Sequence, residues 1–234
     1  MKKISIEVGH GGSDPGAVSG EILEKDINLV VALELKKQLE KHGADVLISR
    51  RADVNDRAAD FFKKAEVYKP DVGVSVHTNA FNGMARGFEV FRNTNSFKDA
   101  SNSLCAAIET EVRALGQTSR GIKDSPFLMS GLRCPTAYLE LGFLDNPADY
   151  SQFDTVEKQR EFAIAYTKGI LRFLGIEWRE PRNNPNGLIS TSPSIPATVW
   201  RVVAGSFRER ANAETHAEEL KRKGVDCFVA QYSL

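Results

Sequence analysis

This sequence has no excess of positive or negative charge. Its 31 lysines and arginines balance its 31 aspartates and glutamates, so no net field draws the protein to nucleic acid or to anionic lipid. No apolar run approaches the roughly 20 residues that a helix needs to cross a bilayer. We therefore expect no nucleic-acid partner and no membrane insertion.

A secretory signal is also missing from the amino-terminal residues. The segment MKKISIEV carries two lysines but no long apolar stretch behind them. Ile4, Ile6 and Val8 alternate with polar residues instead, a pattern that predicts a β-strand. We expect a protein that is synthesised in the cytoplasm and leaves it only through a membrane lesion.

Cysteine is scarce, and short metal or phosphate motifs are absent. Cys105, Cys134 and Cys227 lie far apart and form no CxxC pair, which predicts reduced thiols rather than disulfides or a metal cluster. The sequence contains no HExxH and no GxGxxG, the local signatures of a helical zinc site and of a dinucleotide-binding loop. The ligands of any metal site must therefore come from separate segments.

What the sequence does contain, up to about residue 178, is an alternation of β-rich runs and longer helical patterns. This alternation predicts an α/β fold with a twisted, mostly parallel or mixed sheet covered by helices on both faces. The clearest helix follows the first strand, because apolar residues form one broad stripe along it. The predicted strands are 4–8, 45–49, 71–76, 87–91 and 136–141, and the predicted helices are 26–42, 54–68, 97–116 and 154–174.

The composition changes near residue 179. A stretch rich in proline, asparagine and serine follows, which is typical of a linker. Beyond it lies a compact strand–helix–strand pattern, with strands predicted at 200–207 and 225–232 around a helix at 209–223. We therefore predict three parts: a domain at 1–178, a linker at 179–196 and a small C-terminal unit at 197–234.

Four residues from four segments are candidates for one site. His10 follows the first strand, Glu24 lies at the start of the first long helix, His77 ends the strand VGVSVH, and Glu140 lies near the end of a late strand. In an α/β sheet, ligands bind at the carboxyl ends of strands and the adjoining helix starts. Two imidazoles and a carboxylate are ligands that a catalytic zinc uses, and a second carboxylate can take a proton from an attacking water.

Each of these residues also has an ordinary structural explanation. A single histidine after a strand is more often structural than a ligand, and the loop GHGGSDPG can equally be a tight turn. Glu140 lies between Leu139 and Leu141, the pattern of a half-buried strand residue that faces water. Spacing alone leaves these alternatives open.

Four motifs in order favour the site. GHGGSDPGA, LEKDINL, VSVHTNA and PTAYLELGFLDN resemble the zinc-dependent N-acetylmuramoyl-L-alanine amidases of the amidase-3 family, over about residues 3–174. The resemblance implies a twisted mixed sheet flanked by helices, of the phosphorylase/hydrolase-like kind. It also implies a Zn2+ ion held by His10, Glu24 and His77, with Glu140 as the catalytic acid/base.

One residue departs from the family's pattern. The family usually has aspartate two residues before the glycine of the GH dipeptide, where this chain has Glu7. Because Ile6 and Val8 face one side of the strand, Glu7 faces the other. A carboxylate partner for His10 and a solvent-facing residue both fit that position, so Glu7 is left out of the predicted site.

The resemblance implies hydrolysis of bacterial peptidoglycan at the amide between N-acetylmuramic acid and L-alanine, by a zinc-activated water. A zinc peptidase acting on the stem peptide shares this chemistry. A catalytically silent cell-wall-binding module shares the fold, but has no need of all four site residues. The preferred setting is a phage endolysin for host cell lysis, and the alternative is a sporulation autolysin that opens the mother-cell wall.

The C-terminal unit resembles one half of a SPOR domain, a glycan-binding module. A SPOR domain normally combines two strand–helix–strand units in one sheet, whereas residues 197–234 supply a single unit. Chains this short, below roughly 40 residues, usually need disulfides, metals or partners in order to fold. We expect two chains to pair through this unit into a homodimer; a truncated remnant that does not fold is the alternative.

Overall fold

A computed structural model describes residues 1–126, 128, 129, 131–180 and 210–222. The chain divides into two compact units, Met1–Pro181 and Arg182–Leu234. In the second unit the described residues form helix α6, Arg210–Arg222, where a helix was predicted. The two strands predicted around it, and the linker from residue 181 onward, lie outside the described residues. Pairing of two chains through this unit therefore stays a prediction.

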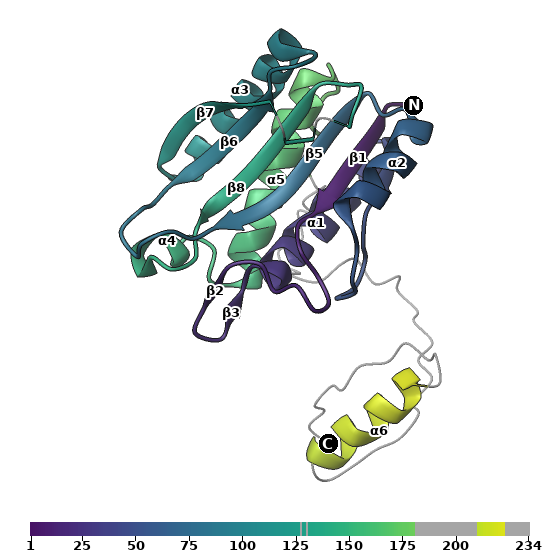
Figure 1. The fold of residues 1–234 in the computed structure, drawn as a ribbon, viewed down its shortest axis with the longest axis vertical. Helices are drawn as coiled ribbons and strands as arrows, with labels where there is room; N and C mark the ends of the chain where they lie inside the picture. Colours follow the sequence, from purple (N-terminus) through teal and green to yellow (C-terminus); the bar gives the residue numbers. More distant parts are fainter. Residues whose placement is uncertain (127, 130, 181–209, 223–234) are drawn as a thin grey trace, which may run out of the picture. The chain divides into compact units, whose positions relative to one another are not determined.

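The first unit is built on a six-stranded sheet in the order β4-β1-β5-β8-β6-β7 (Figure 1). Strands β4, β1, β5 and β8 are parallel to one another, whereas β6 is antiparallel to β8 and parallel to β7. The predicted α/β fold with a mixed sheet is thus confirmed. The strands are β1 Lys3–Val8, β4 Asp45–Ile48, β5 Val72–Asn79, β6 Phe88–Asn93, β7 Ser119–Ser125 and β8 Thr136–Phe143.

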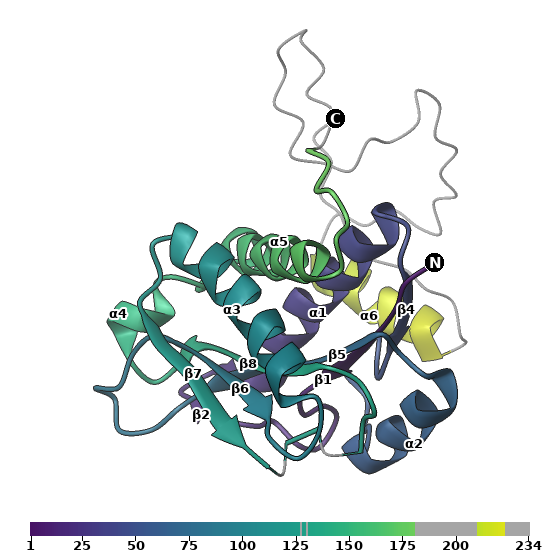
Figure 2. The same cartoon turned by 90° about the horizontal axis from the view of Figure 1, so that it is seen from above.

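Three long helices cover one face of this sheet, and a shorter helix lies on the other side (Figure 2). Helices α1, α3 and α5 pack side by side on the first face, and α2 joins a small apolar cluster on the second. The carboxyl ends of β1, β5 and β8 meet at one edge. The helices are α1 Glu24–Lys41, α2 Ala58–Tyr68, α3 Lys98–Ala114, α4 Pro147–Tyr150 and α5 Val156–Phe173.

The two faces of the central strands differ in chemistry, and period-two alternation is the cause. Ile4, Ile6 and Val8 of β1 are at most 2% exposed and belong to the main core under the long helices. Burial of each large apolar side chain contributes about 1.5–3 kcal/mol. The residues between them, including Glu7, necessarily face the other side, so the polar side chains of this sheet gather on one face.

Several elements differ from the prediction. Helix α2 begins at Ala58 rather than near residue 54, because Asp53 and Asn55 accept hydrogen bonds from the backbone of Gly12 and Ser13, at 2.7 and 2.8 Å. These bonds hold the residues before α2 outside the helix. Four elements were not predicted: strand β7, the hairpin strands β2 Val18–Ser19 and β3 Ile22–Leu23, and the short helix α4.

Two further findings concern the cysteines and the apolar character of the helices. Cys105 and Cys134 are buried free thiols, as predicted, while Cys227 lies outside the described residues. Within the part of the chain that the structure describes, no helix has the length and apolar character to span a membrane.

Candidate metal centre

The loop after β1 brings its histidine to the sheet edge in a strained conformation. His10 has φ 63°, in the left-handed region that residues other than glycine rarely adopt and that is often found at functional sites. A Cβ atom on Gly9 would lie 2.2 Å from the imidazole of His77. Only glycine at that position lets the loop pass this close to β5.

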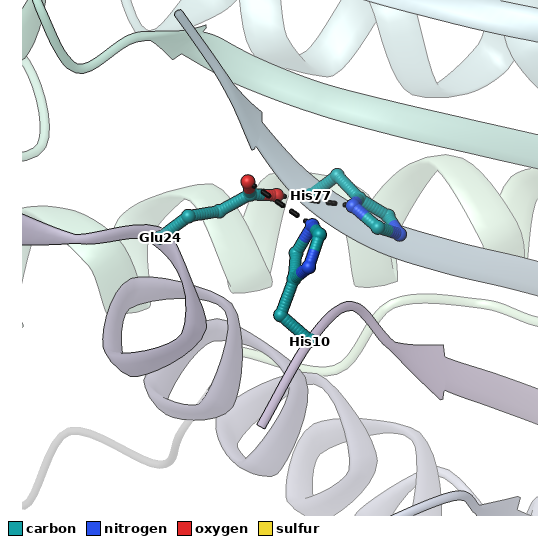
Figure 3. Close-up of side chains that lie close together, drawn as sticks. All are labelled: His10, Glu24 and His77. Carbon is teal, nitrogen blue, oxygen red and sulfur yellow. Dashed lines mark hydrogen bonds and ion pairs between the residues drawn. The ribbon is translucent and has the colours of Figure 1, made fainter. Parts of the chain in front are cut away.

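Three side chains converge at this edge (Figure 3). His10 Nε2 lies 3.2 Å from Glu24 Oε2, and His77 Nδ1 lies 3.0 Å from Glu24 Oε1. One ligand atom from each of the three residues can be chosen so that all lie within 4.8 Å of one another. The structure thus brings together three of the four predicted site residues, from a loop, a helix start and a strand end.

The carboxylate of Glu24 is held from several sides. It accepts hydrogen bonds from the backbone N–H of Ala17 at 2.9 Å and of Thr78 at 3.0 Å. The side-chain amide of Asn28, one turn further along α1, donates to it at 3.1 Å. Burial alone would raise the pKa of Glu24, but the hydrogen bonds from the two imidazoles outweigh it and hold this pKa well below 4.5. Glu24 is therefore an ionised carboxylate, already oriented to bind a metal ion.

The other ring nitrogen of each histidine also has a carboxylate partner. His10 Nδ1 lies 2.8 Å from Asp14 Oδ2, and His77 Nε2 lies 3.3 Å from Glu7 Oε2. Histidines that bind metals usually donate their second N–H to such a group, which fixes the tautomer and the ring orientation. His10 Nε2 and His77 Nδ1 are thereby left available to a metal ion, and both face Glu24.

Glu7 therefore has a position that neither sequence interpretation gave it. It is 7% exposed rather than solvent-facing, and its carboxylate contacts His77 rather than His10. The hydroxyl of Ser75 donates to it, because β1 and β5 pair Glu7 directly with Ser75. These hydrogen bonds keep the pKa of Glu7 below its usual value even though burial opposes this.

The protonation of the histidines follows from these neighbours. Burial lowers the pKa of His77, but the carboxylates of Glu24 and Glu7 more than offset it and raise the pKa to about 10. The hydrogen bond to Glu24 likewise raises the pKa of His10. A metal ion requires neutral imidazoles and displaces these protons when it binds. Two imidazoles and one carboxylate, with the other ring nitrogens occupied, fit a divalent transition metal and not a hard cation such as Ca2+.

Glu140 lies on the strand next to His77. The two residues are direct partners in the β5–β8 register, so their side chains share one face of the sheet. Glu140 Oε2 is buried without a hydrogen-bond partner among the described residues. Burial, reinforced by the charges of Glu24 and Glu89, raises the pKa of Glu140 to about 8 against the opposing effect of His77. A bound cation lowers such a pKa towards neutrality, where a general acid/base works best.

A testable consequence concerns the partner of His77. Glu7→Gln keeps the size of the side chain but replaces the ionised acceptor with a neutral amide. We expect this change to lower the affinity of the centre for zinc by about ten- to a hundredfold, as loss of such a partner typically does. Competition with a zinc chelator measures it.

The matched control is Glu34→Gln, which changes another buried glutamate of the first unit that pairs with Lys37 and Gln38 on α1. Equal zinc affinity in Glu7→Gln and the unsubstituted protein would show that Glu7 does not support the metal site.

Several supporting residues were missed by sequence reasoning, although two of them lie inside the motifs. Asn28 is in LEKDINL and Thr78 is in VSVHTNA, and the hydroxyl of Thr78 donates to Asn28 at 2.9 Å. Arg50 lies outside the four motifs, and it donates to the carbonyls of Gly9 and Lys25 at 3.1 and 2.7 Å. Arg50 thus ties the His10 loop to α1. A side chain's bond to a distant carbonyl leaves no periodic signal in the sequence.

The fold and the site together define an α/β protein with two histidines and one carboxylate that could hold a metal ion, at the carboxyl ends of its parallel strands. Residues 4–172 match the family model Amidase_3, N-acetylmuramoyl-L-alanine amidase. The chain belongs to this family, as its motifs predicted. Residues 195–231 match the SPOR domain model, which agrees with the resemblance of the C-terminal unit.

Individual relatives agree with this assignment. The sporulation-specific N-acetylmuramoyl-L-alanine amidase of Bacillus subtilis (strain 168) is 27% identical over 232 residues, which are 98% of this chain and 84% of that protein. The endolysin of Bacillus phage SPP1 is 28% identical over 191 residues, 79% of this chain and 70% of that protein. The catalytic domain of the amidase CwlV from Bacillus (Paenibacillus) polymyxa var. colistinus superposes with a TM-score of 0.70 and 28% identity, covering 76% of this chain and 100% of that domain.

Proposed function

We propose that this protein hydrolyses the amide between N-acetylmuramic acid and L-alanine in bacterial peptidoglycan, with Zn2+ held by His10, Glu24 and His77. The observation that carries the proposal is the convergence of these three side chains next to Glu140, in a chain of the amidase family. A zinc ion bound here would polarise the carbonyl group of the amide and lower the pKa of a water molecule.

In this proposal, Glu140 moves the protons of the reaction. Its buried Oε2 accepts a proton from the water whose oxygen attacks the amide carbon. The same oxygen then delivers that proton to the leaving nitrogen as the C–N bond breaks, which yields a carboxylic acid and a free amine. A carboxyl group whose pKa lies near the working pH can both accept and donate the proton.

The supporting residues hold the side chains of the site in their positions during the reaction. Glu7 and Asp14 orient the imidazoles, and Asn28 with the Thr78 backbone holds Glu24. Because these side chains are already oriented before the reaction begins, no free energy is needed to reorient them during it.

The bond that is cut identifies the activity. On digestion of purified cell walls we expect new amino termini at L-alanine without any rise in reducing sugar ends. New D-amino acid termini would instead identify a peptidase, and rising reducing ends a glycosidase. Binding to walls without any new ends would identify a silent binding module.

We further propose that the protein acts as a phage endolysin, reaching the wall through a membrane lesion, with residues 195–231 binding glycan. The endolysin of phage SPP1 supports this setting. The alternative, a sporulation autolysin of the mother-cell wall, is supported by the sporulation-specific amidase that aligns over 98% of this chain. A holin gene beside the coding sequence distinguishes the first from the second.

A further inference from the structure

A row of polar side chains leads away from the metal centre across the sheet. His77 of β5 is the register partner of Glu140 of β8, and Glu140 is in turn the partner of Glu89 of β6. Register partners on neighbouring strands place their side chains on the same face. The row thus runs from the metal centre towards β7, the strand that follows β6 in the sheet (Figure 1).

Two basic residues end this row. Glu89 is 3% exposed, and both Arg120 and Lys123 of β7 form ion pairs with its Oε1. The side-chain amide of Asn79 donates to Oε2 at 3.2 Å. One buried carboxylate therefore holds two cations.

Neutralising Glu89 needs only one of these cations. The Arg120 and Lys123 side chains remain 40% and 37% exposed. Among the residues that the structure describes, Glu89 is the single ion-pair partner of both. Each also lies near an aromatic ring, Arg120 at 5.3 Å from the centroid of Phe143 and Lys123 at 5.7 Å from that of Phe91. The pair is thus a positioned, solvent-accessible site with one positive charge in excess.

We propose that Arg120 and Lys123 form a subsite for a free carboxylate on the peptide side of the scissile amide. This inference rests on the proposed function, which places the amide at the metal centre. The glycan and the scissile amide carry no charge near the bond that is cut. An anionic group of the substrate that binds Arg120 and Lys123 therefore belongs to the peptide. Glu89 is a positioning residue that fixes both cations in place.

The spacing indicates which peptide residue carries the carboxylate. Glu89 lies two strands from His77, and neighbouring strands are about 4.8 Å apart, so the cations lie roughly 10 Å from the metal centre. An extended peptide advances about 3.3–3.6 Å per residue. The carboxylate therefore belongs to the second or third residue beyond the scissile bond, and the peptide extends towards β7.

The test uses two synthetic N-acetylmuramoyl tripeptides in which the second residue is joined to the third through its side-chain carboxyl group. The free carboxyl groups of the second and third residues are both ionised in one tripeptide and both carboxamides in the other. We expect the unsubstituted protein to prefer the free carboxylate about tenfold in kcat/KM, as a hydrogen-bonded charge pair provides. The preference should reside mainly in KM, because the subsite binds ground state and transition state alike.

In Arg120→Gln and in Lys123→Gln the preference should fall towards one, and Arg120→Lys should retain part of it. Each single variant leaves Glu89 paired with the remaining cation, so the buried carboxylate is never unpaired. The matched control is Lys98→Gln, the same loss of charge at an exposed residue near β7 that pairs with Asp124 at 3.9 Å; it should keep the full preference.

Equal kcat/KM for the two tripeptides in the unsubstituted protein would overturn the subsite while leaving the amidase proposal intact. A preference that persists in both glutamine variants would overturn it as well. Failure of the unsubstituted protein to cut either tripeptide or intact walls would remove the proposed function, and the subsite with it.

Discussion

Glu140→Gln is expected to lower kcat on cell walls by about a hundred- to ten-thousandfold while zinc binding is unchanged. Proton transfer by a positioned side chain contributes an effect of this size. Glutamine keeps the length and the hydrogen-bonding capacity of the side chain, but it neither accepts nor delivers the proton. Because Glu140 lies beside the candidate ligands His10, Glu24 and His77 and not among them, the metal should stay in place.

The measurement pairs initial rates of wall digestion with the zinc content of the same preparation. Glu157→Gln serves as the control, because it makes the same substitution at an exposed position in the first turn of α5. Near-normal turnover in Glu140→Gln would remove this residue from the mechanism. Loss of zinc from the variant would instead make Glu140 a ligand.

His77→Ala is expected to release zinc and to abolish activity together. Loss of the metal removes several kcal/mol of transition-state stabilisation, which corresponds to a rate about a thousandfold lower or more. The substitution also leaves Glu7 and Glu24 without their shared imidazole partner. Buried carboxylates that lose a partner destabilise the fold, so the variant needs a test of folding.

His42→Ala is the matched control for this variant. His42 is the C-cap of α1, where its ring stacks on Trp178 at a centroid distance of 4.6 Å. Its removal should leave zinc and activity unchanged. His77→Gln, which retains a polar side chain, separates metal loss from unfolding when its thermal transition is compared with that of the unsubstituted protein. Stoichiometric zinc in folded His77 variants would place the site elsewhere.

Much of the site could be predicted because its residues lie in contiguous motifs. His10 follows β1, Glu24 begins α1 and His77 lies near the end of β5, and the sheet's topology brings these positions together. Glu140 could be placed for the same reason, since β8 pairs with β5 in parallel. Spacing alone left structural alternatives open for these residues, and it was the resemblance of the four motifs to the family that favoured one site.

The remainder depended on strand pairing, which local patterns do not encode. The role of Glu7 follows from the register that sets it opposite Ser75, and β1 and β5 are far apart in the chain. The basic subsite was hidden for a related reason. Strand β7, SRGIKDS, has a single large apolar residue, Ile122, so it shows no alternation of polar and apolar residues by which it could be recognised.

If zinc held by His10, Glu24 and His77 is required for hydrolysis, adding zinc back to the metal-free protein restores activity. Metal is removed from the unsubstituted protein with a chelator, zinc is added back in steps, and new L-alanine amino termini released from purified walls are counted at each step. We expect release to be lost with the metal, to return in proportion to bound zinc and to reach its maximum at one zinc ion per chain. Full release of these termini by the metal-free protein would contradict this expectation.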